Sequence, residues 1–319
     1  MYIPVPRGAA MIRQFTHTDF IPLQSVAKEK RRQNLTVSLV VPALNEAATV
    51  GRIVSATRKA LVDQVGLLDE IIVMDGLSAD RTREEAARAG ATVYGFDEVA
   101  GDRAVPAGKG ASLWKSLLVS TGDIVVFIDA DITNFHPRFV YGLVAPLIHD
   151  PALRFVKAYY ERPLEIDGTV LDRHGGRVTE ILVRPVLSAF WPDLAEIIQP
   201  LAGEYAFRRE TVEALPFFSG YGVEIGLVLD IYRACGLDAF AQVDMGMRRH
   251  RNRSLRELGK MSFGIVKALF TKLEEHGKIS VCGSMHTAMI SPDAGAGREQ
   301  TVIAETELEP IARARGGTT

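Results

Sequence analysis

Three short apolar segments alternate with helical segments in the first half of the chain, and this alternation restricts the possible folds more than any other feature. The apolar runs cover residues 37–41, 70–75 and 123–131 and are rich in Val and Ile. Runs of this kind are typical of strands buried on both faces. Helical segments follow each of the first two runs and precede the third. Strand and helix in alternation predict a doubly wound α/β fold with a mostly parallel, Rossmann-like sheet flanked by helices.

Polar residues gather where these predicted strands end. Pro42–Glu46 follow the first run, Asp75 ends the second, and Asp129 and Asp131 end the third. Ligands of open parallel sheets bind beyond the carboxyl ends of the strands. A buried carboxylate needs a partner, and Mg²⁺ and Mn²⁺ prefer oxygen ligands. The pair Asp129 and Asp131 therefore indicates a site for a ribose hydroxyl and a metal ion, although such pairs are also common as helix caps and surface acids.

A dinucleotide-binding dehydrogenase is the main alternative with this fold. Its G-x-G-x-x-G turn should follow the first strand, but this chain has PALNEAATV (42–50) at that place. A phosphate-binding P-loop is also missing, since AGKGAS (107–112) lacks the required spacing. Lys109 in that segment is either a point charge for a nucleotide phosphate or a solvated loop lysine.

Composition excludes several other classes of function. A formal net charge of −2 argues against a general nucleic-acid binder. No segment approaches the ~20 apolar residues of a membrane-spanning helix, and the N-terminus lacks the apolar core of a signal peptide. Cys235 and Cys282 have no metal-type spacing and indicate no disulfide framework. We therefore expect a cytoplasmic protein that binds neither nucleic acid nor membranes.

Seven motifs resemble known glycosyltransferases. VVPALNE, MDGLSADRT and FIDAD are similar to the nucleotide-binding half of GT-A fold enzymes. The segments at 176–185 (GRVTEILVRP), 199–206 (QPLAGEYA), 220–226 (GYGVEIG) and 250–253 (HRNR) resemble glucosyl-3-phosphoglycerate synthases and their mannosyl relatives. The resemblance implies a retaining transfer of hexose from UDP-glucose or GDP-mannose to the 2-hydroxyl of 3-phosphoglycerate. It also implies a divalent cation, Mg²⁺ or Mn²⁺, and a homodimer. The alternative is a soluble GT-A enzyme acting on another phosphorylated or polar-lipid acceptor.

The same resemblance implies roles for individual residues. The nucleotide sugar would be bound by Pro42, Leu44, Asn45, Glu46, Asp75, Asp129, Tyr221 and Glu224. Gly76, beside Asp75, and Lys109, by its charge, complete the residues that we predict for this site without support from the resemblance. The metal ligands would be Asp131 and His250, and the acceptor would be bound by Gly176, Arg177, Thr179 and Asn252. Asp131, Arg177 and Glu224 would take part in the transfer step, with Glu224 orienting the donor sugar.

One of these assignments has a physical argument of its own, and one residue departs from the family pattern. A Gly-Gly turn, an arginine and a helix N-terminus at 175–179 suit a phosphate group; the alternative for Arg177 is an ion pair with a local carboxylate. Gly76 is a departure from the family pattern, since relatives that use uridine nucleotides often have serine at this place. The missing hydroxyl leaves room for a larger base, so the sequence does not choose between UDP and GDP.

The rest of the chain divides by composition. We predict an N-terminal arm over 1–34, with Lys28, Lys30, Arg31 and Arg32 as a solvated basic face. A nucleotide-sugar-binding half covers 35–150 and an acceptor-binding half covers 151–287. Residues 288–319 are expected to form a flexible tail or a dimer arm.

Overall fold

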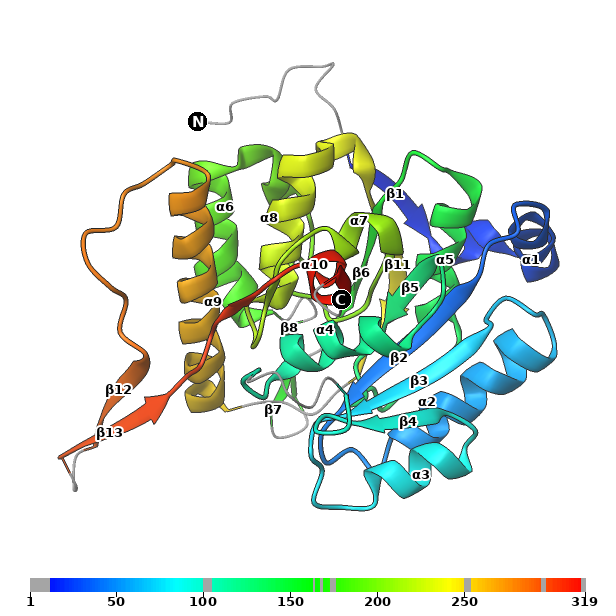
Figure 1. The fold of residues 1–319 in the computed structure, drawn as a ribbon, viewed down its shortest axis with the longest axis horizontal. Helices are drawn as coiled ribbons and strands as arrows, with labels where there is room; N and C mark the ends of the chain where they lie inside the picture. The colour runs from blue at the N-terminus through cyan, green and yellow to red at the C-terminus, as the bar shows by residue number, and fades with distance from the viewer. Residues whose placement is uncertain are drawn as a thin grey trace.

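An eight-stranded sheet forms the centre of the molecule (Figure 1). The computed structural model describes residues 12–99, 105–162, 164–166, 169–172, 176–249, 254–293 and 297–316. The strand order across the sheet is β1 (Arg13–Thr16), β11 (Phe240–Met247), β6 (Phe155–Glu161), β9 (Tyr205–Arg208), β5 (Ile124–Phe127), β2 (Val37–Ala43), β3 (Glu70–Asp75) and β4 (Thr92–Gly95). Strand β9 is antiparallel to β5 and β6, and the remaining pairs are parallel. The predicted mostly parallel sheet is confirmed.

Two hydrophobic cores cover the two faces of this sheet. Successive side chains of β5 alternate between them: Ile124 and Val126 enter one core, and Val125 and Phe127 enter the other. The first core contains side chains of α1 (Leu23–Arg32), α2 (Val50–Thr57), α3 (Thr82–Arg88) and α5 (Arg138–His149). The second contains side chains of α4 (Lys109–Val119), α6 (Arg184–Phe190), α7 (Arg209–Glu213), α8 (Val223–Cys235) and α9 (Leu255–Glu275). Burial on both faces explains why the strands are continuous apolar runs.

The predicted N-terminal arm contributes an edge strand and a helix to this body. Strand β1 pairs in parallel with β11 at the edge of the sheet, and α1 packs against α5. The prediction that Lys30 is solvated is wrong: it is only 4% exposed, and its Nζ lies 2.6 Å from the Asp69 carboxylate. The amphipathic pattern of α1 places Lys30 with Val26 and Ala27, on its buried face.

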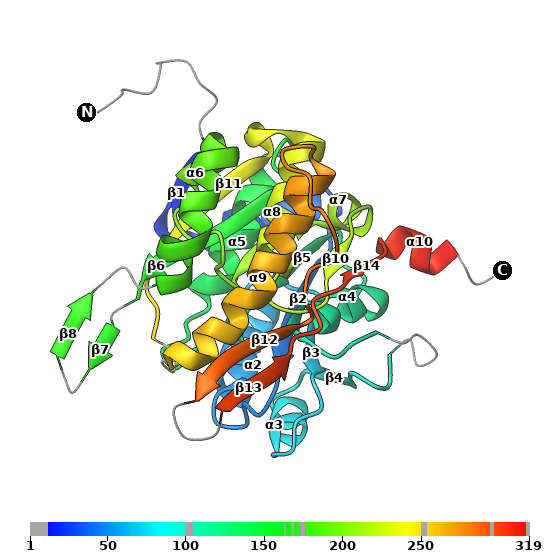
Figure 2. The ribbon, with the colours of Figure 1, turned by 90° about the vertical axis from the view of Figure 1, so that its left-hand side faces the viewer.

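The C-terminal segment first leaves the body and then returns to it. Strands β12 (Ala288–Asp293) and β13 (Gly297–Val302) form an antiparallel hairpin that projects beside α9 (Figures 1 and 2). The chain then adds β14 (Glu307–Leu308) to β10 (Phe217–Phe218) and ends in α10 (Ile311–Gly316), where Ile311 is fully buried. This last part of the predicted tail is therefore packed into the second core. The division of the chain at residues 34, 150 and 287 stays a prediction.

A smaller hairpin, β7 (Leu164–Ile166) and β8 (Thr169–Asp172), projects from the body in the predicted acceptor half (Figure 2). Among the described residues, no helix is long and apolar enough to cross a membrane.

Candidate functional site

Asp129 and Asp131 lie just beyond the carboxyl end of β5 and share a buried arginine. The Nη2 atom of Arg248 lies 3.2 Å from Asp129 Oδ2 and 2.9 Å from Asp131 Oδ1. The Arg248 side chain directly follows β11 and is only 2% exposed, whereas each aspartate is 23% exposed. The two carboxylates therefore face one cationic group at the carboxyl-terminal edge of the sheet. The sequence placed the aspartates correctly at the strand end but gave no role to Arg248.

Glu204 is the third carboxylate around this arginine, and it is fully buried. Its Oε1 atom lies 3.0 Å from Arg248 Nη2, and Tyr160 Oη donates a hydrogen bond of 2.7 Å to its Oε2 atom. Burial raises the pKa of the Glu204 carboxyl, and the positive charge of Arg248 opposes that shift. Arg248 thus ties a buried acid to the two strand-end aspartates. Glu204 lies in QPLAGEYA, a motif that the sequence singled out without assigning its members.

Lys109 links Asp129, one of the strand-end aspartates, to α8. Its Nζ atom lies 2.7 Å from Asp129 Oδ1 and 2.8 Å from Glu224 Oε1. Glu224 belongs to the first turn of α8, and its side chain is 4% exposed. Burial disfavours the lysine cation, but Asp129 and Glu224 outweigh it and raise the pKa of Lys109. Of the two alternatives left open by the sequence, the solvated loop lysine is wrong, because the structure shows a paired charge inside the site.

Gly203 is required for this arrangement because it leaves room for the Asp129 carboxylate. A Cβ atom on Gly203 would lie 2.4 Å from each carboxylate oxygen, far inside contact distance. Any larger residue would displace Asp129 from Lys109 and Arg248. Gly203 immediately precedes Glu204, so the same turn of QPLAGEYA shapes two of the acids in the cluster.

The loops after β2 and β3 hold each other by hydrogen bonds. The backbone N–H of Asn45 donates to Ser78 Oγ at 2.8 Å, and the N–H of Ala79 donates to Asn45 Oδ1 at 2.8 Å. The N–H of Glu46 donates to Thr82 Oγ1 at 2.8 Å. These bonds fix a loop in which Asn45 adopts the left-handed region, with φ at 57°. The structure thus brings the predicted base-pocket residues 44–46 and 75–76 together at one edge.

Asp75 offers an acceptor to a ligand at this edge. Its side chain is 2% exposed, and its Oδ2 accepts the N–H of Ser78 at 3.2 Å. The buried Oδ1 has no hydrogen-bond partner among the residues that the structure describes. A buried acceptor without a donor is costly, and an N–H group of a nucleobase would satisfy it. Leu44 and Leu77, in the same two loops, are 55% and 53% exposed and available as apolar contacts.

The predicted acceptor and metal residues are described only in part. Gly176 has φ +85° and precedes a helical segment in which Thr179 is buried and Arg177 half-buried. The carboxylate of Glu180 pairs with Arg184. His250 and Asn252 lie outside the described residues, so their roles stay predictions.

The described residues fit a divalent cation at Asp131 but do not enclose one. Within the described ranges, no three His, Cys, Asp or Glu side chains form a group that could hold a metal ion. Asp129 and Asp131 nevertheless present carboxylate oxygens to one cationic atom of Arg248. Mg²⁺ commonly takes one or two carboxylates and completes its shell with water and substrate phosphates. An open site of this kind suits a metal that arrives with a diphosphate.

Lys157 is a further buried basic residue, close to the carboxylates of Glu204, Glu224 and Asp129. The sequence did not predict a role for it. It is 1% exposed, its Nζ donates to the carbonyl oxygen of Ala202 at 2.6 Å, and it lies 4.7 Å from the centre of the Tyr205 ring. Burial lowers the pKa of Lys157 to about 7 from its ordinary value of 10.5. Through its hydrogen bond to Ala202, Lys157 holds the turn that contains Gly203. Its lowered pKa means that the side chain loses its positive charge near neutral pH.

Replacing Lys157 with Met should change how stability depends on pH. Between pH 7 and 10 the unfolded chain binds more protons at Lys157 than the folded chain, so the unfolding free energy of the wild type rises with pH. The unfolding free energy of the wild type minus that of Lys157→Met should therefore increase by roughly 1 kcal/mol per pH unit. Urea unfolding at pH 7, 8 and 9 measures the difference. Parallel curves for the two proteins would contradict the lowered pKa.

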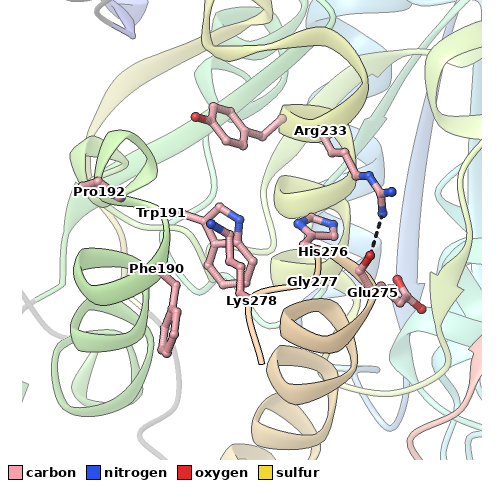
Figure 3. A pocket seen from close by; sticks show the side chains of 9 residues that line it. Phe190, Trp191, Pro192, Arg233, Glu275, His276, Gly277 and Lys278 are labelled. Atoms are coloured by element: carbon pink, nitrogen blue, oxygen red, sulfur yellow. Dashed lines mark hydrogen bonds between the residues drawn. The ribbon is translucent and has the colours of Figure 1, made fainter. Parts of the chain in front are cut away.

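A pocket of about 630 Å³ lies apart from these residues (Figure 3). It is formed by the ends of α6, α8 and α9 and includes Trp191, Tyr232, Arg233 and His276. None of the predicted site residues that the structure describes lines it.

Comparisons with known proteins identify the family of this chain. The model of the family described as Glycosyl transferase family 2 matches residues 38–190. The glucosyl-3-phosphoglycerate synthase of Petrotoga mobilis is 44% identical over 269 residues, which are 84% of this chain and 83% of that protein. The enzyme of the same name from Mycobacterium tuberculosis (strain H37Rv) is 44% identical over 85% of this chain and 79% of its own length.

Solved structures extend the similarity to the whole fold. Mannosyl-3-phosphoglycerate synthase from Rubrobacter xylanophilus matches with a TM-score of 0.87 and 37% identity, over 94% of this chain and 97% of that one. Glucosyl-3-phosphoglycerate synthase from Mycobacterium tuberculosis, in complex with Mn²⁺, UDP-glucose and phosphoglyceric acid, matches with a TM-score of 0.84 and 36% identity, over 96% of this chain and 100% of that one. The same enzyme with Mn²⁺, UDP and glucosyl-3-phosphoglycerate matches with a TM-score of 0.83 and 38% identity, over 95% of this chain and 100% of that one.

Proposed function

Because this chain belongs to the glucosyl-3-phosphoglycerate synthase family, we propose that it transfers glucose from UDP-glucose to the 2-hydroxyl group of 3-phosphoglycerate. The chain is a glycosyltransferase, and its sequence alone left UDP-glucose and GDP-mannose open as donors. The structures of the Mycobacterium tuberculosis enzyme with UDP-glucose and with the glucosylated product support the glucose donor. The observation in this structure that carries the proposal is the position of Lys109, between Asp129 and Glu224.

The donor nucleotide would bind across the loops after β2 and β3. Asp75 Oδ1 would accept a base N–H, because it is buried and has no donor among the described residues. Asn45 and Glu46, whose backbones are fixed to the second loop, would line the base and ribose. Lys109 would place its positive charge near the diphosphate, and Asp129 would contact the ribose or the sugar.

Asp131, together with His250, would hold the divalent cation. When bound, Mg²⁺ or Mn²⁺ neutralises negative charge that develops on the departing diphosphate. The turn after β5 places the Asp131 carboxylate beyond the carboxyl end of the strand, where it lies 2.9 Å from Arg248. Gly176, Arg177, Thr179 and Asn252 would bind the phosphate of the acceptor, and this supplies proximity between the 2-hydroxyl and the anomeric carbon.

The transfer would take place on one face of the sugar. The bond between the anomeric carbon and the phosphate oxygen breaks, the new bond to the acceptor oxygen forms, and the acceptor proton moves to the departing phosphate. The Glu224 carboxylate lies 2.8 Å from the Lys109 ammonium group. An ion-paired carboxylate is a weaker nucleophile, so this contact favours a role for Glu224 in orienting the sugar.

Replacing Glu224 with Ala should lower kcat by about 100-fold without eliminating turnover, the scale expected for loss of one positioned polar contact. Glu224→Gln, which keeps the shape of the side chain, should retain more activity than Glu224→Ala. Steady-state kinetics and calorimetric binding of UDP-glucose measure the effect. Complete loss of turnover with intact donor binding would contradict an orienting role and favour direct catalysis.

A donor and acceptor panel tests the proposed function. We expect release of UDP that requires both UDP-glucose and 3-phosphoglycerate, with a lower kcat/KM for GDP-mannose and for other phosphorylated acceptors. Release of nucleotide without 3-phosphoglycerate, or preference for a lipid phosphate, would contradict the proposal.

The variant Gly76→Ser sharpens the test, since a Cβ there would lie 3.4 Å from the Ala43 oxygen and 3.7 Å from Leu44 Cβ, so that serine fits. One added hydrogen bond should shift preference toward the UDP donor by about 5-fold.

The hairpin β12–β13 would join two copies of the chain in a homodimer. It projects from the body, and Ile290 and Val302 on it are 48% and 74% exposed. Phe270 on the adjacent α9 is 42% exposed. Substituting Ile290 and Val302 with Asp should convert a dimer into a monomer in light scattering after size exclusion. A wild-type monomer, or a dimer that persists in this variant, would contradict the hairpin as the interface.

A further inference from the structure

The carboxylate of Glu305 supports the turn that leads into α8. Glu305 lies between β13 and β14 and is 8% exposed. The backbone N–H of Gly220 donates to its Oε1 at 2.9 Å, and the carboxylate also accepts a hydrogen bond from the backbone of Gly222. Tyr221, a predicted donor-sugar residue, lies between these two glycines. A side chain from the C-terminal segment thus binds the backbone of a motif 85 residues earlier in the chain.

Three glycines leave space for this single carboxylate. A Cβ on Gly220 would lie 2.4 Å from Glu305 Oε2, and a Cβ on Gly264 of α9 would lie 2.5 Å from the same atom. A Cβ on Gly222 would lie 3.1 Å from Oε1. None of the three has the positive φ that favours glycine. The close approach of Glu305 is therefore the physical reason for glycine at 220 and 264, whereas a Cβ on Gly222 would first meet Ala268 Cβ, at 2.5 Å.

The turn that Glu305 holds also contacts the helix that carries Lys109. The N–H groups of Gly110 and Ala111, in the first turn of α4, donate to the carbonyl oxygens of Gly220 and Ser219 at 3.2 and 2.8 Å. On the other side, N–H groups of the turn donate to Glu305. A helix N-terminus stabilises a nearby carboxylate, so Glu305 is held electrostatically by α8 as well. The position of the turn therefore sets both Lys109 and Glu224.

We propose that Glu305 is a positioning residue for the sugar transfer: it fixes the turn 219–222 so that Tyr221 and Glu224 face the donor sugar beside Lys109. The inference rests on the proposed function and adds to it a residue from outside the seven motifs that carry the family resemblance. Glu305 touches no substrate in this role and acts through the turn. Its loss should therefore affect kcat and donor KM while leaving acceptor binding intact.

Kinetics of Glu305→Ala and Glu305→Gln, with Glu307→Gln as a matched control, test the proposal. Glu307 lies two residues later and anchors the same segment through an ion pair with Lys272 of α9. Misplacement of catalytic groups by about 1 Å can cost on the order of 100-fold, so Glu305→Ala should lower kcat by about that factor at unchanged KM for 3-phosphoglycerate. Glu305→Gln, which keeps an acceptor for Gly220, should recover part of the loss.

The control separates positioning from simple anchoring of the segment. Glu307→Gln should keep kcat within about 2-fold of the wild type, in line with a change outside the site, even if both substitutions lower the melting temperature. Equal losses of kcat in Glu305→Ala and Glu307→Gln, or normal kinetics of Glu305→Ala, would overturn the inference. The wild type is measured in the same series: an active wild type with normal Glu305 variants refutes the positioning role, whereas an inactive wild type refutes the proposed function itself.

Discussion

Replacing Asp131 with Asn is expected to lower kcat by about 1,000-fold, the upper end for loss of one preorganised charge-stabilising group. Asn keeps the size of the side chain and one oxygen but removes the negative charge that attracts a divalent cation. The carboxylate lies 2.9 Å from Arg248, at the open mouth of the sheet. Affinity for the metal together with UDP should therefore fall along with turnover.

Two measurements check this expectation. Electron paramagnetic resonance of free Mn²⁺ in the presence of UDP reports binding independently of activity, and UDP release reports turnover. Asp123→Asn is a matched control, because Asp123 lies at the opposite end of β5 and accepts hydrogen bonds from Thr36. It should retain both properties. Normal Mn²⁺ binding and turnover in Asp131→Asn would rule out the assigned metal ligand.

Replacing Arg248 with Met should destabilise the protein by about 3–5 kcal/mol, the cost of leaving a buried charge without its partner. Glu204 is fully buried and would keep the hydrogen bond from Tyr160 but lose its cation. Asp129 and Asp131 would also lose the cation that they share. Guanidinium unfolding of the variant and the wild type measures this loss.

The double variant Arg248→Met/Glu204→Gln tests the cause. Removing the buried acid should restore a large part of the stability but not the activity, because the strand-end aspartates still lack Arg248. In the single variant, burial raises the pKa of Glu204 without the opposing charge of Arg248, so the folded state binds more protons than the unfolded state. The stability deficit should therefore grow as pH rises above the unfolded pKa of Glu204 and shrink as pH falls toward it. If the single variant Arg248→Met is as stable as the wild type, the ion pair between Arg248 and Glu204 does not stabilise the protein.

Local patterns were sufficient for the framework of the site. The apolar runs 37–41 and 70–75 lie in β2 and β3, and the run 123–131 forms β5 followed by the turn with both aspartates. Their polar ends converge because parallel strands end at the same edge of a sheet. Strand β9, which joins the sheet antiparallel between β5 and β6, was not predicted. Its four residues follow a segment that contains proline and glycine, and a strand this short has little periodicity to detect.

The partners of the charged residues were beyond the reach of local patterns. Arg248 stands in a basic run typical of an exposed surface, yet it pairs with aspartates 117 and 119 residues away. Lys157 lies within β6, and Glu204 directly precedes β9. Neither residue could be assigned from the sequence, because a single charged residue beside apolar neighbours carries no information about its partner.

The sequence by itself determined the mostly parallel character of the sheet, the polar ends of three of its strands and the family, because strand burial and motif order are visible in consecutive residues. Only the tertiary structure decided which charges meet: Arg248 with three carboxylates, Lys109 with two, and Glu305 with the turn before α8. The physical reason is that a charge in a protein interior is stable only beside its partner, and the fold brings such partners together from distant parts of the chain.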